Sequence, residues 1–232
     1  MKSFCALILC YLVAFTIASP FPLKPIEYPV CAEGVHIIIA RASAEPPGQG
    51  IMGNVAQEVI DQVTGSDSIA VDYPASLQDY AESERKGVEA LTQLINASYV
   101  DCPTSKMVLM GYAQGAQIVG DVLCGSAAFG TITPPLNRAW GEMISAVILM
   151  ADPSHIANQT WNLGNSTRDG VFPYRNIEQC AWYETRTQSY CDNDDIACDS
   201  GNSFEVYSSY TRTYGKAAAD FVVRRASQEG VP

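Results

Sequence analysis

Residues 107–115, MVLMGYAQG, combine an apolar run with two glycines placed four positions apart. This pattern predicts a strand that passes through a sharp turn, built around Gly111 and Gly115, into a helix. In the Gly-x-Ser-x-Gly form of the motif, the turn lifts a serine hydroxyl above the sheet, and the helix N-terminus offers N–H groups to an oxyanion. The middle residue here is Ala113. A methyl group has no lone pair, so this position cannot attack a carbonyl carbon.

The acidic segment Cys191-Asp-Asn-Asp-Asp-Ile-Ala-Cys198 is the second candidate for chemistry. Calcium binding is one reading of its carboxylates. However, an EF-hand loop beginning at Asp192 would have Ala197 and Ser203 where the glycine and glutamate ligand positions fall. The sequence also lacks a C-x-x-C pair of the kind that holds zinc. We therefore expect no metal and no cofactor.

The chain has only two histidines that could serve as a base. His36 lies inside the run VHIIIA and is best explained as a structural residue of a strand. His155 precedes Asp195, whereas a nucleophile elbow is usually followed by the acid and then the histidine. A rearranged site that uses His155 stays open as an alternative.

The elements that would position these residues alternate along the chain. Continuous apolar runs, typical of buried parallel strands, predict strands over 35–40 and 143–150, and we expect further strands over 68–73, 106–110 and 185–190. Apolar residues at helical spacing predict helices over 51–63, 80–95, 116–124 and 215–225. Strands that alternate with helices favour an α/β fold, with a mostly parallel sheet covered by helices on both faces.

Composition limits the class of protein. The 232 residues are 47% hydrophobic and 17% charged, so the chain can form a sizeable core and is not disordered. Its net charge of −11 disfavours binding to nucleic acid or to an anionic membrane surface. Residues 1–18 are typical of a signal peptide, residues 19–30 form a Pro-rich lead-in, and 31–232 form one domain. We expect a secreted monomer with no membrane span.

Cysteines and sequons agree with export. Six of the eight cysteines lie after the predicted signal peptide, which favours three disulfides, although the sequence alone leaves 15 pairings open. Three Asn-x-Ser/Thr sequons, at Asn96, Asn158 and Asn165, are compatible with N-glycosylation.

From residue 31 to the C-terminus the chain resembles the cutinase and acetylxylan esterase family of small secreted serine esterases. Gly111-Tyr-Ala-Gln-Gly115 looks like the family's G-Y-S-Q-G with the serine replaced. Residues 41–48, 71–75 and 151–154 are similar to further family segments. The resemblance implies a three-layer α/β/α sandwich of the α/β-hydrolase type. It also implies an oxyanion hole formed by Ser43 and the Gln114 N–H.

The same resemblance implies the catalytic triad positions and the disulfides. Ala113 takes the nucleophile position, Asp195 the acid position and Tyr207 the histidine position. The implied disulfide pairs are Cys31–Cys102, Cys124–Cys180 and Cys191–Cys198.

Two of the three triad positions thus lack the residue type that the chemistry needs. The sequence predicts a catalytically impaired or inactive member of this family. The functions left to it are binding of an ester, of a cell-wall polysaccharide or polyester such as acetylated xylan or cutin, or of a protein partner. Two alternatives stay open: an active carboxylic ester hydrolase with a non-standard site, and an engineered inactive variant. Loss of both residues favours natural degeneration over engineering.

Overall fold

The computed structural model describes residues 31–231; the predicted signal peptide and Pro-rich lead-in lie outside the described residues. Six strands, all parallel, form one sheet in the order β2-β1-β3-β4-β6-β5. The strands are β1 (Val35–Ala40), β2 (Asp67–Ala70), β3 (Lys106–Tyr112), β4 (Ile144–Met150), β5 (Asn162–Leu163) and β6 (Thr187–Tyr190). The three central strands are almost wholly buried, as their continuous apolar sequences predict.

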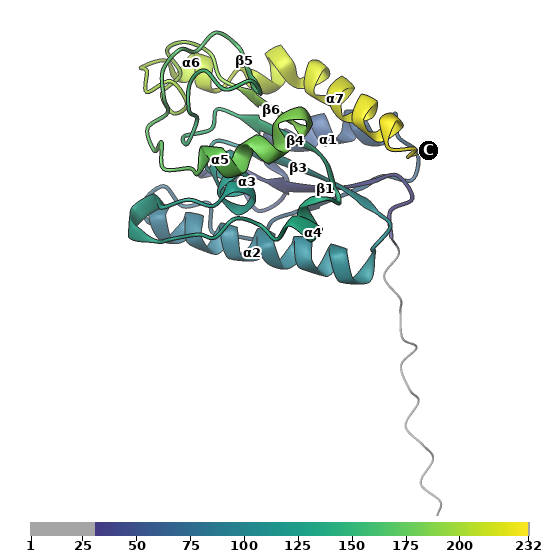
Figure 1. Ribbon diagram of the computed structural model, residues 1–232. Helices are drawn as coiled ribbons and strands as arrows, with labels where there is room; N and C mark the ends of the chain where they lie inside the picture. The colour runs from purple at the N-terminus through teal and green to yellow at the C-terminus, as the bar shows by residue number, and fades with distance from the viewer. Residues whose placement is uncertain (1–30, 232) are drawn as a thin grey trace, which may run out of the picture.

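Helices cover both faces of the sheet (Figure 1). On one face, α1 (Gly53–Ile60) and α7 (Tyr210–Gln228) enclose one apolar core. On the other face, α2 (Tyr80–Asp101) and α3 (Gln114–Cys124) enclose a second. Shorter helices connect these elements: η1 (Gly50–Met52), η2 (Ala128–Gly130), α4 (Arg138–Gly141), α5 (Ile177–Cys180), η3 (Ala181–Arg186) and α6 (Phe204–Tyr207). The predicted three-layer α/β/α architecture is confirmed.

The boundaries differ from the sequence-based ones where tertiary contacts decide. The strand predicted over 68–73 ends at Ala70, because the carbonyls of Val71 and Tyr73 turn to accept hydrogen bonds from the Arg41 guanidinium. The helix predicted over 80–95 continues to Asp101, beyond its last fully buried residue, Ile95. The short elements β5, α4, α5 and α6 have too few residues for a periodic pattern, and the sequence did not predict them.

Three disulfides join the pairs that the family resemblance implies. Cys31–Cys102 ties the start of the described chain to the end of α2, Cys124–Cys180 ties α3 to α5, and Cys191–Cys198 closes a short loop. Within residues 31–231, no helix has both the length and the apolar character needed to cross a bilayer.

The parallel order of the strands brings the candidate residues to one edge of the sheet. Ser43 follows β1, Ala113 follows β3, Asp152 follows β4, and the Cys191–Cys198 loop follows β6. Because the carboxyl ends of parallel strands share one edge, segments far apart in sequence meet there.

Candidate functional site

Ala113 lies at the apex of a tight turn between β3 and α3. Its φ of 50° and ψ of −116° are strained for a residue with a side chain. The turn requires glycine on both sides: a Cβ at Gly111 would lie 2.5 Å from the Gly115 carbonyl oxygen, and one at Gly115 would collide with the backbone of Ala40. The backbone of a nucleophile elbow is therefore intact, although its apex carries only a methyl group.

Two backbone N–H groups beside Ala113 are available to a ligand. The N–H groups of Ser43 and Gln114 have no acceptor among the described residues, and both residues line the same hollow as Ala113. The Gln114 side chain is buried and accepts a hydrogen bond from Ser83 Oγ at 3.0 Å, which fixes the start of α3. This is the arrangement expected of an oxyanion hole.

A buried arginine holds the segment that carries Ser43. The Arg41 guanidinium donates to the carbonyl oxygens of Glu45 at 3.0 Å and Tyr73 at 2.6 Å. In return, the Tyr73 hydroxyl donates to the Arg41 carbonyl at 2.5 Å. The Glu45 carboxylate accepts from the N–H groups of Ala42 and Ile51, both at 2.7 Å. Residues 41–48 and 71–75, two of the segments that resemble the family, are therefore hydrogen-bonded to each other and together hold Ser43 in place.

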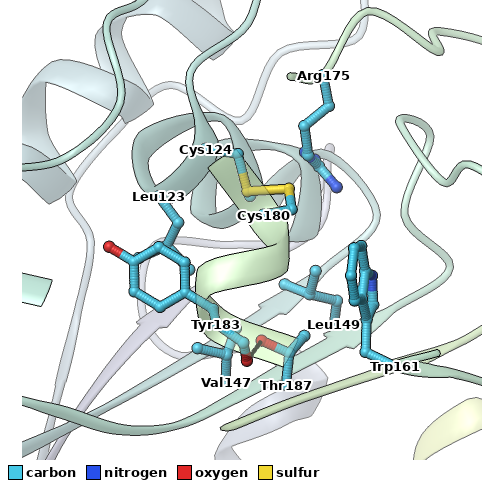
Figure 2. A pocket seen from close by; sticks show the side chains of 10 residues that line it. Leu123, Cys124, Val147, Leu149, Trp161, Arg175, Cys180, Tyr183 and Thr187 are labelled. Carbon is cyan, nitrogen blue, oxygen red and sulfur yellow. Dashed lines mark hydrogen bonds between the residues drawn. A yellow bond between two sulfur atoms is a disulfide. The ribbon is translucent and has the colours of Figure 1, made fainter. Parts of the chain in front are cut away.

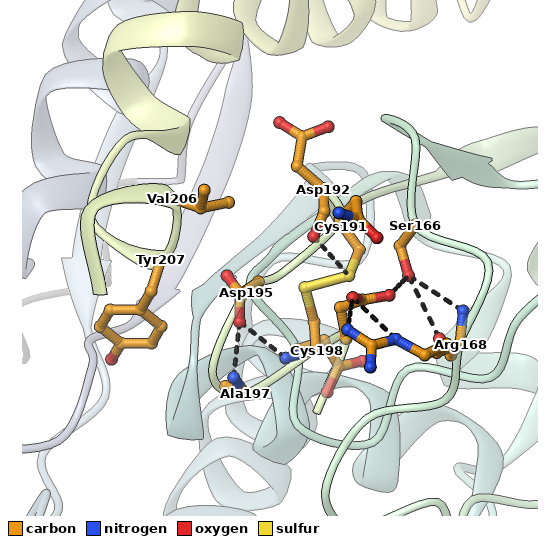
Figure 3. The surroundings of a disulfide bond; sticks show 12 residues. Ser166, Arg168, Cys191, Asp192, Asp195, Ala197, Cys198, Val206 and Tyr207 are labelled. Atoms are coloured by element: carbon orange, nitrogen blue, oxygen red, sulfur yellow. Dashed lines mark hydrogen bonds and ion pairs between the residues drawn. A yellow bond between two sulfur atoms is a disulfide. The ribbon is translucent and has the colours of Figure 1, made fainter. Parts of the chain in front are cut away.

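Asp195 is buried behind the hollow in the Cys191–Cys198 loop (Figure 3). Its Oδ1 accepts from the N–H groups of Ala197 at 2.6 Å and Cys198 at 2.8 Å, whereas Oδ2 accepts no hydrogen bond of ordinary geometry. Burial raises the pKa of this carboxyl, while these two N–H groups and the Tyr210 hydroxyl partly offset the shift. The loop thus holds one oxygen in place and leaves the other available.

Tyr207 ends the short helix α6 and is half-buried against other aromatic rings. Its ring lies 5.8 Å from Tyr112 and 5.4 Å from Phe204, measured between centroids. Burial, followed by the negative charge of Asp195, raises the pKa of the Tyr207 phenol to about 12. The phenol therefore stays protonated near neutral pH, so it is a hydrogen-bond donor and not a base. None of the described residues hydrogen-bonds its hydroxyl.

These residues surround one hollow of about 150 Å³. It is lined by Ser43, Ala113, Gln114 and Tyr207, and also by Ile196 and Ala197, the two residues that follow Asp195. A larger apolar lobe of about 380 Å³ adjoins it. Ser43, Leu77 and Tyr207 line both spaces. The structure therefore brings the predicted site residues together. Four of them line the hollow directly, whereas Asp195 is buried beneath the residues that line it.

Neither histidine belongs to this hollow. His36 pairs with Asp67 through Nδ1 and Oδ1 at 2.5 Å, near the start of β1 and so at the opposite end of that strand. His155 is 3% exposed, and neither ring nitrogen has a hydrogen-bond partner among residues 31–231. Burial lowers the pKa of its imidazole. A residue so enclosed cannot reach an ester in the hollow, which argues against the rearranged site.

Within residues 31–231, no three histidine, cysteine or acidic side chains form a group able to hold a metal ion. The acidic loop uses its carboxylates internally: Asp192 accepts from the Tyr214 hydroxyl, and Asp199 pairs with Arg168. The predicted glycosylation sites Asn96, Asn158 and Asn165 are all exposed, and their modification stays a prediction.

The sequence analysis missed a buried charged network beneath the site. Arg175 forms ion pairs with Asp121 of α3, at 3.2 Å, and with Asp152, and the side chains of all three are at most 5% exposed. Figure 2 shows Arg175 beside the Cys124–Cys180 disulfide, at the rim of a water-sized internal hollow. Gly120 allows this approach, because a Cβ there would collide with the guanidinium. Arg175 and Gly120 are far apart in the sequence and meet only in the folded structure, so no local pattern could have predicted their contact.

Glu84 of α2 adds a third carboxyl to this network and gives stability a pH dependence. Burial and the neighbouring Asp121 raise the pKa of Glu84 to about 8, well above its unfolded value. Between pH 6.5 and 8 the folded state therefore binds more protons than the unfolded state. The free energy of unfolding should fall by about 2 kcal/mol over this window as the pH rises.

Glu84→Gln should remove most of this decline, because the amide mimics the protonated acid. Urea unfolding at several pH values, followed by circular dichroism, measures the slope. Glu89→Gln, on the exposed side of the same helix, is the matched control and should keep the decline. An unchanged slope in Glu84→Gln would show that another group titrates. The pH window begins at 6.5 because the pKa of His155 is lowered in the folded state. At more acidic pH, the titration of His155 makes the free energy of unfolding rise with pH, which opposes the effect of Glu84.

Comparisons with known proteins agree with this geometry. The profile of the family described as Cutinase matches residues 31–226. Cutinase 11 of Verticillium dahliae is 31% identical over 209 residues, covering 85% of this chain and 70% of the relative. Acetylxylan esterase 2 of Talaromyces purpureogenus is 28% identical over 216 residues, which cover 88% of this chain and 92% of the relative. A solved acetylxylan esterase superposes with a TM-score of 0.79 at 29% identity, covering 85% of this chain and all of the other. The chain belongs to the cutinase family.

Proposed function

We propose that this protein is an exported member of the cutinase family that has lost ester hydrolysis and binds an intact ester in the Ala113 hollow. One observation carries the proposal: the apex of a well-formed elbow holds a methyl group, and a protonated phenol occupies the position expected for the general base. Without a nucleophile no acyl-enzyme can form, and without a base neither a serine nor a water molecule can be activated.

The parts that would bind an ester are still in place. The Ser43 and Gln114 N–H groups and the Tyr207 hydroxyl offer three donors around the hollow. The charges of Asp195 and Glu45 act on the Tyr207 phenol, so the surroundings are negative. A neutral ester carbonyl would accept from the donors without the repulsion that a carboxylate would meet. This favours an intact ester over the free acid as ligand.

The adjoining lobe supplies room for an acyl chain. It is lined by Ile51, Leu77 and Phe204, and the last two side chains are exposed to solvent. The names of the relatives suggest cutin or acetylated xylan as the source of such an ester. Three disulfides support an oxidising, extracellular location. A protein partner is the competing ligand, and a binding screen against both polymers separates the two.

Hydrolysis of p-nitrophenyl butyrate tests the proposal directly. We expect a kcat about 10⁶-fold below that of an ordinary serine esterase, because loss of either the serine or the histidine has an effect of this size in subtilisin, the reference case. A serine-directed phosphonate should neither label the protein nor change the residual rate. Rapid hydrolysis that the phosphonate abolishes would contradict the proposal and establish an active esterase with a non-standard site.

A further inference from the structure

A groove of about 210 Å³ lies at the end of the sheet opposite the Ala113 hollow. It runs between the start of the edge strand β2 and the C-terminal half of α2, beside the Cys31–Cys102 disulfide. Its apolar lining includes Ile69 of β2 and Leu94 and Ala97 of α2. Ile69 is 39% exposed, so within the described part of the chain the groove leaves apolar surface open.

The groove follows an open edge of the sheet. β2 is the first strand in the sheet order and, within residues 31–231, it pairs only with β1. Soluble proteins generally cover such an edge, because an open edge beside apolar side chains invites other chains to associate. No lysine or arginine lines the groove, so it offers no counter-charge to an acidic ligand. These properties favour an apolar segment as its occupant.

The chain itself enters the described structure at this groove. Cys31 is the first described residue, and both Cys31 and Ala32 line the groove. The disulfide to Cys102 fixes this entry point at the end of α2. The residues that precede Cys31 are therefore tethered beside the groove at an effective concentration on the order of millimolar. Even a weak contact with the groove would be occupied at such a concentration.

The sequence of the tethered segment is suited to an apolar groove. Residues 19–30, SPFPLKPIEYPV, contain four prolines. Proline disfavours a helix and favours the polyproline II conformation, which repeats every three residues. At this period the two charged residues, Lys24 and Glu27, fall on one face. From residue 20 onward the other two faces carry only apolar residues: Pro20, Pro22, Leu23, Pro25, Ile26, Tyr28 and Pro29.

The lengths of the segment and the groove also match. Leu94 precedes Cys102 on α2 by a distance of about 12 Å at the helical rise. Ile26 precedes Cys31 by about 15 Å at the rise of polyproline II. Because Cys31 and Cys102 are joined, a segment that runs back along α2 would bring Ile26 level with Leu94.

We infer that residues 25–30 of this chain bind in the groove between β2 and α2, with Ile26 against Leu94 and Ile69. The segment thereby covers the open edge of the sheet and keeps a second copy from pairing with it. This inference goes beyond the proposed function and does not depend on it, because the groove and the Ala113 hollow lie at opposite ends of the strands.

Methyl NMR on the secreted, full-length protein tests the contact directly. In a sample labelled at the isoleucine and leucine methyl groups, we expect nuclear Overhauser effects from Ile26 to both Leu94 and Ile69. In a mixture of one copy labelled only at isoleucine and another labelled only at leucine, the Ile26–Leu94 effect should be absent, because the contact lies within one chain. An effect in the mixture would place a second copy in the groove and overturn the inference. Its absence from both samples would overturn the inference as well.

A double-mutant cycle measures whether the contact stabilises the fold. Ile26→Ser should lower the equilibrium constant for folding at least about threefold less in a Leu94→Ala background than in the wild-type protein, because the two side chains share one contact. Phe21→Ser is the matched control, since Phe21 precedes the bound residues and falls on the charged face; it should show no such coupling. Urea unfolding followed by circular dichroism gives the four equilibrium constants. Ile69→Ala replaces Leu94→Ala if that variant fails to fold, and an additive cycle would overturn the inference.

Discussion

Ala113→Ser combined with Tyr207→His should raise ester hydrolysis by at least about 10³-fold over either single variant. Each substitution alone leaves the proton-transfer chain broken. With Ala113→Ser only, the hydroxyl has no base, and with Tyr207→His only, the imidazole has nothing to activate. The two effects should therefore be strongly non-additive, as expected for residues that act as a unit.

Much of the geometry that the repaired site needs is already present. The backbone of Ala113 has the strained elbow conformation, and the Ser43 and Gln114 N–H groups have no acceptor within the described part of the chain. Asp195 Oδ1 is held by two N–H groups, whereas Oδ2 is buried and accepts no hydrogen bond of ordinary geometry from the described residues. That oxygen is the acceptor that could orient an imidazole at position 207. A displacement of about 1 Å would still reduce the gain on the order of 10²-fold.

The measurement is the initial rate on p-nitrophenyl acetate for the two single variants and the double variant, each shown to be folded by circular dichroism. The rate of the double variant should rise with pH through the imidazole pKa, near 6.5 in the reference state. Adding Asp195→Asn should remove most of the gain. A folded double variant no faster than the singles would contradict the assignment of Tyr207. High activity of Ala113→Ser alone would reveal another base.

Local sequence patterns were sufficient to predict the elbow and every strand of the sheet except β5. The runs at Val35–Ala40 and Ile144–Met150 are apolar at every position or nearly so, because both faces of these strands are covered, and such runs allow few other structures. The spacing of Gly111 and Gly115 predicted the turn, because only glycine tolerates the backbone contacts found there. The positions of Asp195 and Tyr207 came from the family resemblance, since nothing local identifies them.

Features that depend on contacts between distant segments could not be predicted. Arg175 meets Asp121 and Asp152 across 54 and 23 residues of chain, and a lone arginine in sequence is ordinarily a surface residue. Phe129 and Tyr174 each look like single exposed aromatics until the fold places them side by side. The shape of the hollow and its lobe likewise depends on segments that follow all six strands of the sheet.

Arg175→Leu should destabilise the protein by about 3–5 kcal/mol, because it leaves two buried carboxylates without a counter-charge. The guanidinium also donates to the Gln117 carbonyl at 3.2 Å, so the substitution removes a contact to the α3 backbone as well. Its effect should therefore exceed that of an exposed ion pair. Arg85→Leu, which removes the exposed pairs with Glu82 and Glu89 on the surface of α2, should change the free energy of unfolding far less than Arg175→Leu does.

Urea unfolding at pH 7 measures both variants, and a third variant separates charge from lost packing. Adding Asp121→Asn and Asp152→Asn to Arg175→Leu removes the unpaired charges and should recover part of the stability, because neutral amides cost less to bury than carboxylates. An Arg175→Leu variant as stable as Arg85→Leu would mean that water or another group neutralises the carboxylates. Asp152 precedes Pro153, which lines the Ala113 hollow. Because the ion pair anchors this wall, Arg175→Leu should weaken ester binding even where the protein remains folded.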